Sequence, residues 1–396
     1  MFIGLVGKPS SGKSTFYRAA TLAPAEINSR PFTTIKPNIG VAYAKVKCPH
    51  LDFEKQCNPN NSFCIDGNRF VAFKLMDVAG LVPGAHEGKG MGNQFLNDLS
   101  PADALIHVVD ASGTTDEEGN GTAGFDPLVE VDFLVDEVEK WFFGILKSNW
   151  AKVVRRAFVD KKDAVKELAV ILSGVGISEA HVMKAKSVSK INVENPVSVN
   201  DDELFRFSKI LRGISKPIII AANKMDLPAS KENIERIKQT YPGMTVIPCC
   251  SEAELALREA HEKGLIHYVP GENDFKIIDE SKLDDKQKKA LEFIREKILG
   301  AWGSTGVQDV INKSVFEYLD MIAVFPVEDE TRLTDKKGRV LPDAKLLRNG
   351  SNALDLAYEV HTDLGKNFIR AIDCRTKRTI GKDTALKNRD VVKIIA

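Results

Sequence analysis

Short apolar runs predict the buried strands of a parallel sheet. Residues 2–6, 104–110, 218–222 and 245–248 are almost wholly apolar, a pattern typical of strands that are covered on both faces. The stretch "STFYRAATLA", which follows the first run after a glycine-rich loop, predicts a helix. We therefore expect an α/β fold, with a mostly parallel sheet and helices on both faces.

The segment between the second and third runs has a helical period instead. Apolar residues such as Val131, Leu134 and Val138 recur at helical spacing, and a loop of about a hundred residues inside one domain is implausible. We predict an inserted helical domain at residues 111–212 between two parts of the sheet domain, 1–110 and 213–312. Its expected helices span 127–150, 151–172 and 177–191, after a flexible linker at 113–124.

The last part of the chain changes in character. Apolar strands are expected at residues 368–372 and 391–395, flanking one helix near 354–361. Residues 331–396 contain 15 Lys and Arg against 8 Asp and Glu. We predict a third, small and basic domain at residues 313–396.

Composition limits the class of protein. Lys and Arg number 55 and Asp and Glu number 55, so the whole molecule is not a polyelectrolyte partner for nucleic acid. No apolar run approaches the roughly 18 residues of a membrane helix, and the first run leaves no room for a signal sequence. Six scattered cysteines indicate a reducing compartment. We expect a cytoplasmic monomer that does not contact membranes.

The loop after the first run has the spacing of a phosphate-binding loop, G-x-x-x-x-G-K-S. Its glycines let backbone N–H groups point at a phosphate beside a helix N-terminus. Lys13 can reach the β- and γ-phosphates, and the Ser14 hydroxyl can ligate Mg²⁺. A ligand-free turn is disfavoured because all four fixed positions are present. The predicted triphosphate site comprises Gly7, Lys8, Pro9, Ser10, Ser11, Gly12, Lys13, Ser14 and Thr15.

A second motif adds a carboxylate. "KLMDVAGL" at 74–81 ends an apolar strand at Asp77, three residues before Gly80. Asp77 can hold Mg²⁺ through water, and the Gly80 N–H can contact the γ-phosphate. We therefore predict Ser14 and Asp77 as metal ligands and Gly80 as part of the catalytic site.

A third motif indicates guanine. "NKMD" follows the run at 218–222, at a strand end that reaches the ligand crevice. Asp226 can accept hydrogen bonds from guanine N1–H and the exocyclic amine, which adenine does not offer there. Lys224 is expected to cover the base plane, and Asn223 to join this loop to the phosphate loop. The chain is therefore expected to bind GTP.

Together the motifs resemble a translation-factor-class P-loop GTPase. The stretches "RPFTTIKPN" and "DVAGLVPGAHEGKGMGNQFL" resemble the Obg-type family, in its YchF branch. The resemblance implies that Thr34, which keeps the family's spacing to Pro37 and Asn38, is the metal-binding threonine of the first switch. It also implies a helical insertion where the periodicity predicts one.

The chain departs from this family at three places. Many YchF-type members have glutamate where Asp226 stands, a change that accompanies ATP preference. They usually have asparagine at the position of Ser10, a residue linked in relatives to assistance by monovalent cations, so the sequence leaves potassium activation open. The guanine-backing motif is represented here only by Cys250 and Ser251, and the Ser251 N–H is expected to contact the base oxygen.

Slow hydrolysis is expected, because phosphoryl transfer needs positioning and charge stabilisation. Many switch GTPases orient the water with glutamine at the position of Leu81, which cannot hydrogen-bond. His86, with Glu87 behind it, is a candidate to replace that glutamine. The alternative for His86 is a solvated loop histidine or a contact with a partner protein.

The C-terminal stretch "VLPDAKLLRNGSNALDLAYEVHTDLGKNFIRAID" resembles a TGS domain, a β-grasp module associated with RNA-related work. A basic face can follow nucleic-acid phosphates, so we expect contact with RNA or the ribosome. The alternative is a solvated protein-binding module. The basic residues chosen for testing are Lys366, Arg370, Arg375, Lys377 and Arg378.

Cys48, His50, Cys57 and Cys64 lie in an excursion between two strands and have the donor types of a zinc site. Their spacing lacks a C-x₂-C pair, so reduced surface thiols are the alternative.

Three other functions stay open for the whole chain. One is an ATPase of the YchF kind, and a second is an RNA or ribosome adaptor gated by nucleotide with incidental hydrolysis. A small-molecule kinase is disfavoured because no acceptor-pocket motif follows the phosphate loop.

Overall fold

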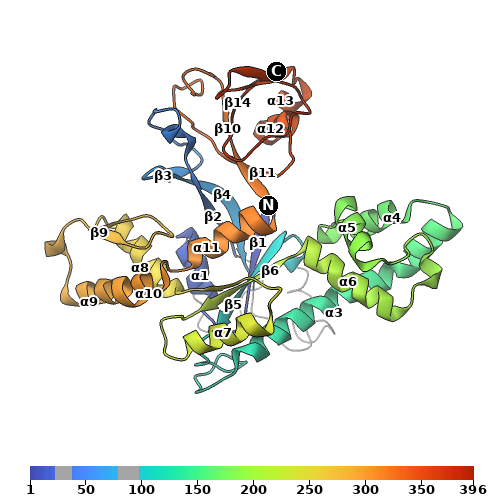
Figure 1. The fold of residues 1–396 in the computed structure, drawn as a ribbon, viewed down its shortest axis with the longest axis horizontal. Coiled ribbons are helices and arrows are strands. Elements are labelled where there is room, and N and C mark those ends of the chain that lie inside the picture. The colour runs from blue at the N-terminus through green and yellow to red at the C-terminus, as the bar shows by residue number, and fades with distance from the viewer. Residues whose placement is uncertain (23–37, 79–97) are drawn as a thin grey trace.

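A computed structural model describes residues 1–22, 38–78 and 98–396 of the chain. Figure 1 shows a central sheet, a helical group that projects to one side, and a C-terminal domain that lies above the sheet. Among the described helices, none is both long and apolar enough to cross a membrane.

The central sheet is built on parallel strands. In spatial order its strands are β2 (Asn38–Lys47), β4 (Asn68–Asp77), β1 (Phe2–Val6), β5 (Ala104–Asp110), β6 (Ile218–Asn223) and β7 (Val246–Pro248), and β3 (Phe63–Ile65) pairs with β4. The strands from β4 to β7 run parallel, and only β2 and β3 pair antiparallel with β4. The parallel part places the carboxyl ends of β1, β5 and β6 at one edge.

Helices cover both faces of this sheet, which explains why its central strands β1, β5 and β6 are mostly apolar. On one face, Leu5 and Val108 pack with Phe16 of α1 (Lys13–Thr21) and Val310 of α11 (Val307–Asn312). On the other face, the side chains of Val109 and Ile220 pack against α3 (Pro127–Val154) and α7 (Ser230–Thr240).

A further group packs beside the sheet at the left of Figure 1. It comprises α8 (Ser251–Glu262), β8 (Ile266–Tyr268), β9 (Phe275–Ile277), α9 (Asp285–Phe293) and α10 (Gly300–Trp302). These elements share a hydrophobic cluster with β6 and α7, so they extend the sheet domain.

Helix α3 contributes to three hydrophobic clusters, two of them against the central sheet. Its first half places Leu134 and Val138 against the central sheet, and its second half places Phe142 and Leu146 in a separate helical cluster. That cluster also contains α4 (Ala164–Ile171), α5 (Glu179–Ser189) and α6 (Asp201–Ser215). The predicted domain boundary between residues 110 and 111 stays a prediction. The hydrophobic core of the sheet domain and that of the helical cluster are separated within α3 itself.

Two expectations for this region were wrong. The helix expected at 151–172 is interrupted: α3 ends in a π-helical turn, η3 (Arg155–Val159), and α4 begins after the N-cap Asp163. The side chain of Asp163 accepts hydrogen bonds from Val165 N and Lys166 N, which stabilises a new helix start.

The segment 113–124 is not an open linker either. Asp116 Oδ1 accepts hydrogen bonds from Glu118 N and Asn120 N, and Thr115 bridges to Gly121. These local bonds fold the segment into a turn.

The C-terminal domain is a second, mixed sheet covered by a helix. Its strand order is β11 (Lys345–Arg348), β10 (Met321–Val327), β14 (Val391–Ile395), β12 (Arg370–Asp373) and β13 (Arg378–Ile380). Helix α12 (Ala353–Val360) buries Leu356 against Val324 and Val392, and α13 (Thr362–Lys366) follows it. A helix across a mixed sheet is the β-grasp arrangement expected from the sequence.

Candidate functional site

The phosphate-binding loop lies between β1 and α1, at the carboxyl edge of the central sheet. The backbone N–H groups of Ser10, Ser11 and Gly12 have no acceptor among the described residues. Gly12 is the N-cap of α1 and has φ 95°. Successive N–H groups that lie unpaired before a helix form a concavity that attracts anions.

Lys13 and Ser14, in the first turn of α1, face the end of β4. Lys13 Nζ lies 2.6 Å from Asp77 Oδ1, and Ser14 Oγ donates a hydrogen bond of 3.3 Å to Asp77 Oδ2. The register places Asp77 opposite Leu5, directly before the loop. A hydroxyl and a carboxylate at one point fit the hard oxygen ligands that Mg²⁺ requires. Bound there, Mg²⁺ would neutralise charge on the β- and γ-phosphates.

The segment after β6 joins the phosphate loop through Asn223. Its Nδ2 donates to Ser11 O at 2.9 Å, across 212 residues of sequence. Its Oδ1 accepts from both the backbone N–H and the hydroxyl of Ser251. Asn223 is buried and forms all three of these hydrogen bonds. It therefore fixes the phosphate loop relative to the segment after β6, as expected from the sequence.

Asp226 lies beside Cys250, at the same end of the sheet. Burial, and then the Asp226 carboxylate, raise the pKa of the Cys250 thiol, so the thiol stays protonated. It donates to Asp226 Oδ1 at 3.3 Å. Cys250 therefore orients the carboxylate, while the Ser251 N–H is engaged by Asn223 rather than directed at a base.

Lys224 is held by a residue that the sequence analysis did not select. Its Nζ lies 2.7 Å from Asp110 Oδ2, at the end of β5. Burial opposes ionisation of Asp110, but hydrogen bonds from Lys224, Ser112 and Thr115 hold the pKa of its carboxyl below the ordinary value. The Lys224 ammonium is thus engaged, and its aliphatic stem is the part that can cover a base.

The turn at 113–124 packs directly on the phosphate loop. A Cβ on Gly119, where φ is +86°, would lie 2.8 Å from Pro9 Cβ and 2.9 Å from Ser10 Oγ. Lys8 Nζ donates to Thr115 O at 2.5 Å and lies over the Phe125 ring. The Gly and Asp content of this segment, interpreted as a linker, was the only sequence signal for this contact.

Beneath the loop lies a buried polar chain that the sequence analysis also missed. Lys8 Nζ is 3.6 Å from Glu130 Oε2, and Glu130 Oε1 is 3.8 Å from His107 Nε2. Burial lowers the pKa of His107 to about 3, so this histidine is neutral near pH 7. Burial is also the largest cause that raises the pKa of Glu130 to about 7, against the attraction of Lys8.

This raised pKa predicts that stability depends on pH through Glu130. Between its ordinary value of 4.5 and about 7, the folded chain binds more protons than the unfolded chain, so stability falls as pH rises. At 1.36 kcal/mol per pKa unit the loss is roughly 2 to 3 kcal/mol. Glu130→Gln cannot ionise, so its melting temperature relative to wild type should rise from pH 5 to pH 8. A difference in melting temperature between the two proteins that stays constant from pH 5 to pH 8 would contradict this prediction.

Three predicted residues, Thr34, Gly80 and His86, lie outside the described residues. Of the others, the structure gathers Lys13, Ser14 and Asp77 at the phosphate loop and Asn223, Lys224 and Asp226 at the base loop. The arrangement can hold a nucleoside triphosphate with Mg²⁺.

Three family models match the chain. Residues 2–131 match the 50S ribosome-binding GTPase model, residues 221–329 match the Obg-like GTPase YGR210-like, G4 motif-containing domain, and residues 337–396 match the TGS domain.

Known proteins are similar over most of the chain. A GTP-binding protein of Methanocaldococcus jannaschii is 51% identical over 394 residues, covering 100% of this chain and 98% of that protein. The ribosome-binding ATPase YchF of Bacillus subtilis is 29% identical over 379 residues, covering 93% of this chain and 87% of that protein. The crystal structure of a GTP-binding protein from Pyrococcus horikoshii has a TM-score of 0.79 and 40% identity, with 100% of both chains covered.

Proposed function

The chain belongs to the Obg-like, YchF-type family of P-loop nucleotide-binding proteins, and on that premise we propose that it is a GTP-hydrolysing switch that acts on the ribosome. One observation supports a nucleotide switch above all others. Asn223 ties the phosphate loop to the segment that contains Asp226, which places both within reach of a single ligand.

GTP rather than ATP is the proposed nucleotide. The Asp226 carboxylate is oriented by the Cys250 thiol and can accept from the two N–H donors on guanine's edge. The similar protein from Methanocaldococcus jannaschii is named GTP-binding, which agrees. The ATPase alternative is supported by the names of less similar relatives, among them the Bacillus subtilis protein.

The chain's own residues would supply binding and charge stabilisation. The N–H groups of the phosphate loop and Lys13 would hold the phosphates, while Ser14 and Asp77 would hold Mg²⁺. We further propose Thr34 as a metal ligand, Gly80 as a γ-phosphate contact and His86 as the residue that positions water. Lys13 turns from Asp77 toward the phosphates when nucleotide binds, because the β- and γ-phosphates carry more charge than one carboxylate.

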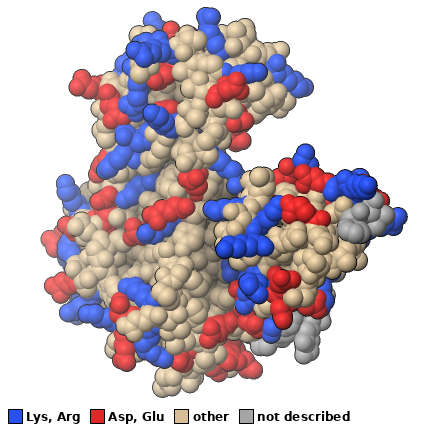
Figure 2. All heavy atoms as spheres, turned by 45° about the vertical axis from the view of Figure 1, so that its right-hand side comes forward, with Lys and Arg blue, Asp and Glu red and all other residues tan. Residues whose placement is uncertain are grey.

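The C-terminal domain is the proposed contact with ribosomal RNA. Figure 2 shows Lys and Arg spread over its visible face, with fewer Asp and Glu. Two of the five basic residues selected from the sequence are engaged within the chain: Arg375 pairs with Asp52, and Lys377 donates to Glu330 O. Lys366, Arg370 and Arg378 are exposed and make no ion pair among the described residues. These three are therefore the proposed phosphate contacts, in a cytoplasmic monomer.

We expect ribosomes to accelerate GTP hydrolysis by this chain and to lose that effect when the three residues are changed to alanine. Removing three phosphate contacts weakens ribosome binding. It should also make the slope of log K against log salt concentration shallower by about three units. Turnover without ribosomes should stay unchanged. Phosphate release and co-sedimentation, measured across a salt series, check both effects.

The matched control is a triple alanine variant of Lys184, Lys231 and Lys286, which are exposed on other parts of the molecule. It should behave like wild type. Ribosome binding without any acceleration would favour the adaptor alternative, and equal losses in both triple variants would contradict the assigned face.

A further inference from the structure

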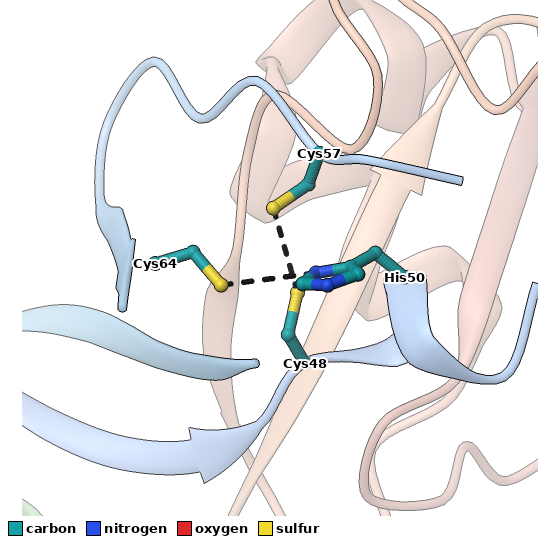
Figure 3. A group of neighbouring side chains, drawn as sticks. All are labelled: Cys48, His50, Cys57 and Cys64. Carbon is teal, nitrogen blue, oxygen red and sulfur yellow. Dashed lines mark hydrogen bonds between the residues drawn. The ribbon is translucent and has the colours of Figure 1, made fainter. Parts of the chain in front are cut away.

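Four metal-ligand side chains converge in the excursion between β2 and β3. Cys48 follows β2, His50 lies in the short helix η1 (Pro49–Leu51), Cys57 lies in the loop after it, and Cys64 lies on β3. Figure 3 shows the three sulfur atoms and the imidazole directed at one point. Their donor atoms all lie within 4.8 Å of one another.

The distances match the edges of a zinc tetrahedron. With Zn–S near 2.3 Å and Zn–N near 2.0 Å, tetrahedral geometry requires about 3.8 Å between sulfurs and about 3.5 Å between sulfur and nitrogen. Cys48 Sγ and Cys57 Sγ are 3.9 Å apart, and Cys64 Sγ is 3.7 Å from His50 Nδ1. A disulfide would need about 2.05 Å between sulfurs, so both Cys48 and Cys57 are free thiols.

Burial rules out the interpretation of these groups as surface thiols. Cys48 is 0% exposed, Cys57 7% and His50 8%, and only Cys64 is partly accessible. Three thiols and an imidazole crowded together in an apolar cluster gain little from one another without a common ion. We propose that Cys48, His50, Cys57 and Cys64 bind a structural Zn²⁺ ion.

The charge around the four residues supports this site. Three thiolates and Zn²⁺ together carry one net negative charge, which needs a cation nearby when buried. Arg69, on β4 directly opposite Cys64 in the register, is 0% exposed and pairs with no carboxylate among the described residues. Within the described part of the chain, its guanidinium donates to the neutral oxygens of Ser62 and Leu341. The zinc–thiolate centre supplies the missing counter-charge.

The site lies where the sheet domain contacts the C-terminal domain. Within the excursion, Asn58 N donates to Val340 O at 2.8 Å and Asn60 N to Pro342 O at 2.7 Å. Asp52 forms ion pairs with both Arg375 and Arg389. Cys48 and Cys57 also share a hydrophobic cluster with Phe325 and Val391 of the second sheet. Zinc would therefore fold the excursion into the surface on which the C-terminal domain sits.

The test is metal content of the full chain, produced without a histidine tag and purified without chelator. Elemental analysis should find about one zinc per chain, and Cys57→Ser and Cys64→Ser should lower this at least about tenfold. Cys374→Ser is the matched control, because Cys374 is buried in the same hydrophobic cluster but lies outside the group of four. It should retain zinc.

A second measurement on the wild type covers the case in which the variants do not fold. Zinc is removed under reducing conditions and Co²⁺ is added, which should give the intense visible absorption of tetrahedral thiolate-bound cobalt, reversed by one equivalent of zinc. Wild-type protein with no stoichiometric zinc and no such spectrum would overturn the proposal. Bound iron, or zinc that persists in Cys57→Ser, would overturn it equally.

Discussion

Asp226→Asn should weaken GTP binding by about 10⁴-fold while leaving ATP binding nearly unchanged. The carboxylate accepts hydrogen bonds from two donors on guanine, and an amide presents one acceptor and one donor instead. The exocyclic amine of guanine then faces an N–H group, and both are left unpaired in a dry site. Adenine offers neither donor at this position, so the substitution should change the affinity for ATP very little.

Xanthine nucleotide provides the sharper comparison. Xanthine keeps the N1–H donor but has a carbonyl in place of the guanine amine, so the asparagine amide can pair with both groups. XTP should bind Asp226→Asn more tightly than it binds wild type, the reverse of GTP. Calorimetric titration of both proteins with GTP, ATP and XTP measures this, with Asp202→Asn, an exposed change on α6, as control. Equal losses for GTP and ATP would show that Asp226 does not recognise the base.

Gly12→Ala should remove binding of GTP and ATP alike, by about 10²-fold or more. A Cβ at this position would lie 2.0 Å from Asn223 Nδ2, and the φ of +95° strains any residue with a side chain. Either the phosphate loop or Asn223 must move, and the bond from Asn223 to Ser11 O is lost. Both ends of the site are therefore displaced together.

Gly144→Ala is the matched control for this change. Gly144 lies in the middle of α3, where an added Cβ meets no atom within 4 Å, and alanine favours the helix by about 1 kcal/mol. That variant should bind both nucleotides normally and melt slightly higher. If Gly12→Ala also bound both nucleotides normally, the contact between the two loops would have no role in binding.

The strands were the most predictable part of this fold. The ranges expected at 2–6, 104–110 and 391–395 coincide with β1, β5 and β14. Each range is a mostly apolar run, although His107 interrupts the second and Lys393 the third. Burial of the strand accounts both for the apolar pattern in the sequence and for where the strand begins and ends. The interruption between η3 and α4 was less visible, because the helical period on both sides of Asp163 hides the new N-cap.

The parts of the site that were missed depend on contacts between distant segments. Asp110 looked like the polar end of a strand, yet its partner Lys224 lies 114 residues away. The close approach of Gly119 to Pro9 and Ser10 likewise joins segments that are about 110 residues apart, so only the folded structure reveals it. Motif spacing predicts which residues bind the ligand. It does not predict the side chains that only hold those binding residues in place. Asp110 and Glu130 are of this second kind.

Helix α3 is one continuous helix that connects the triphosphate site to the projecting helices. Its N-cap, Asp126, directly follows Phe125, whose ring contacts Lys8 of the phosphate loop. The helix then runs for 28 residues into the helical cluster. At 1.5 Å per residue it is about 42 Å long, so a tilt of about 5° at the loop displaces its far end by about 4 Å. A shift of the phosphate loop on loss of a phosphate would therefore be amplified along α3 into a movement large enough for a partner to detect at the other end.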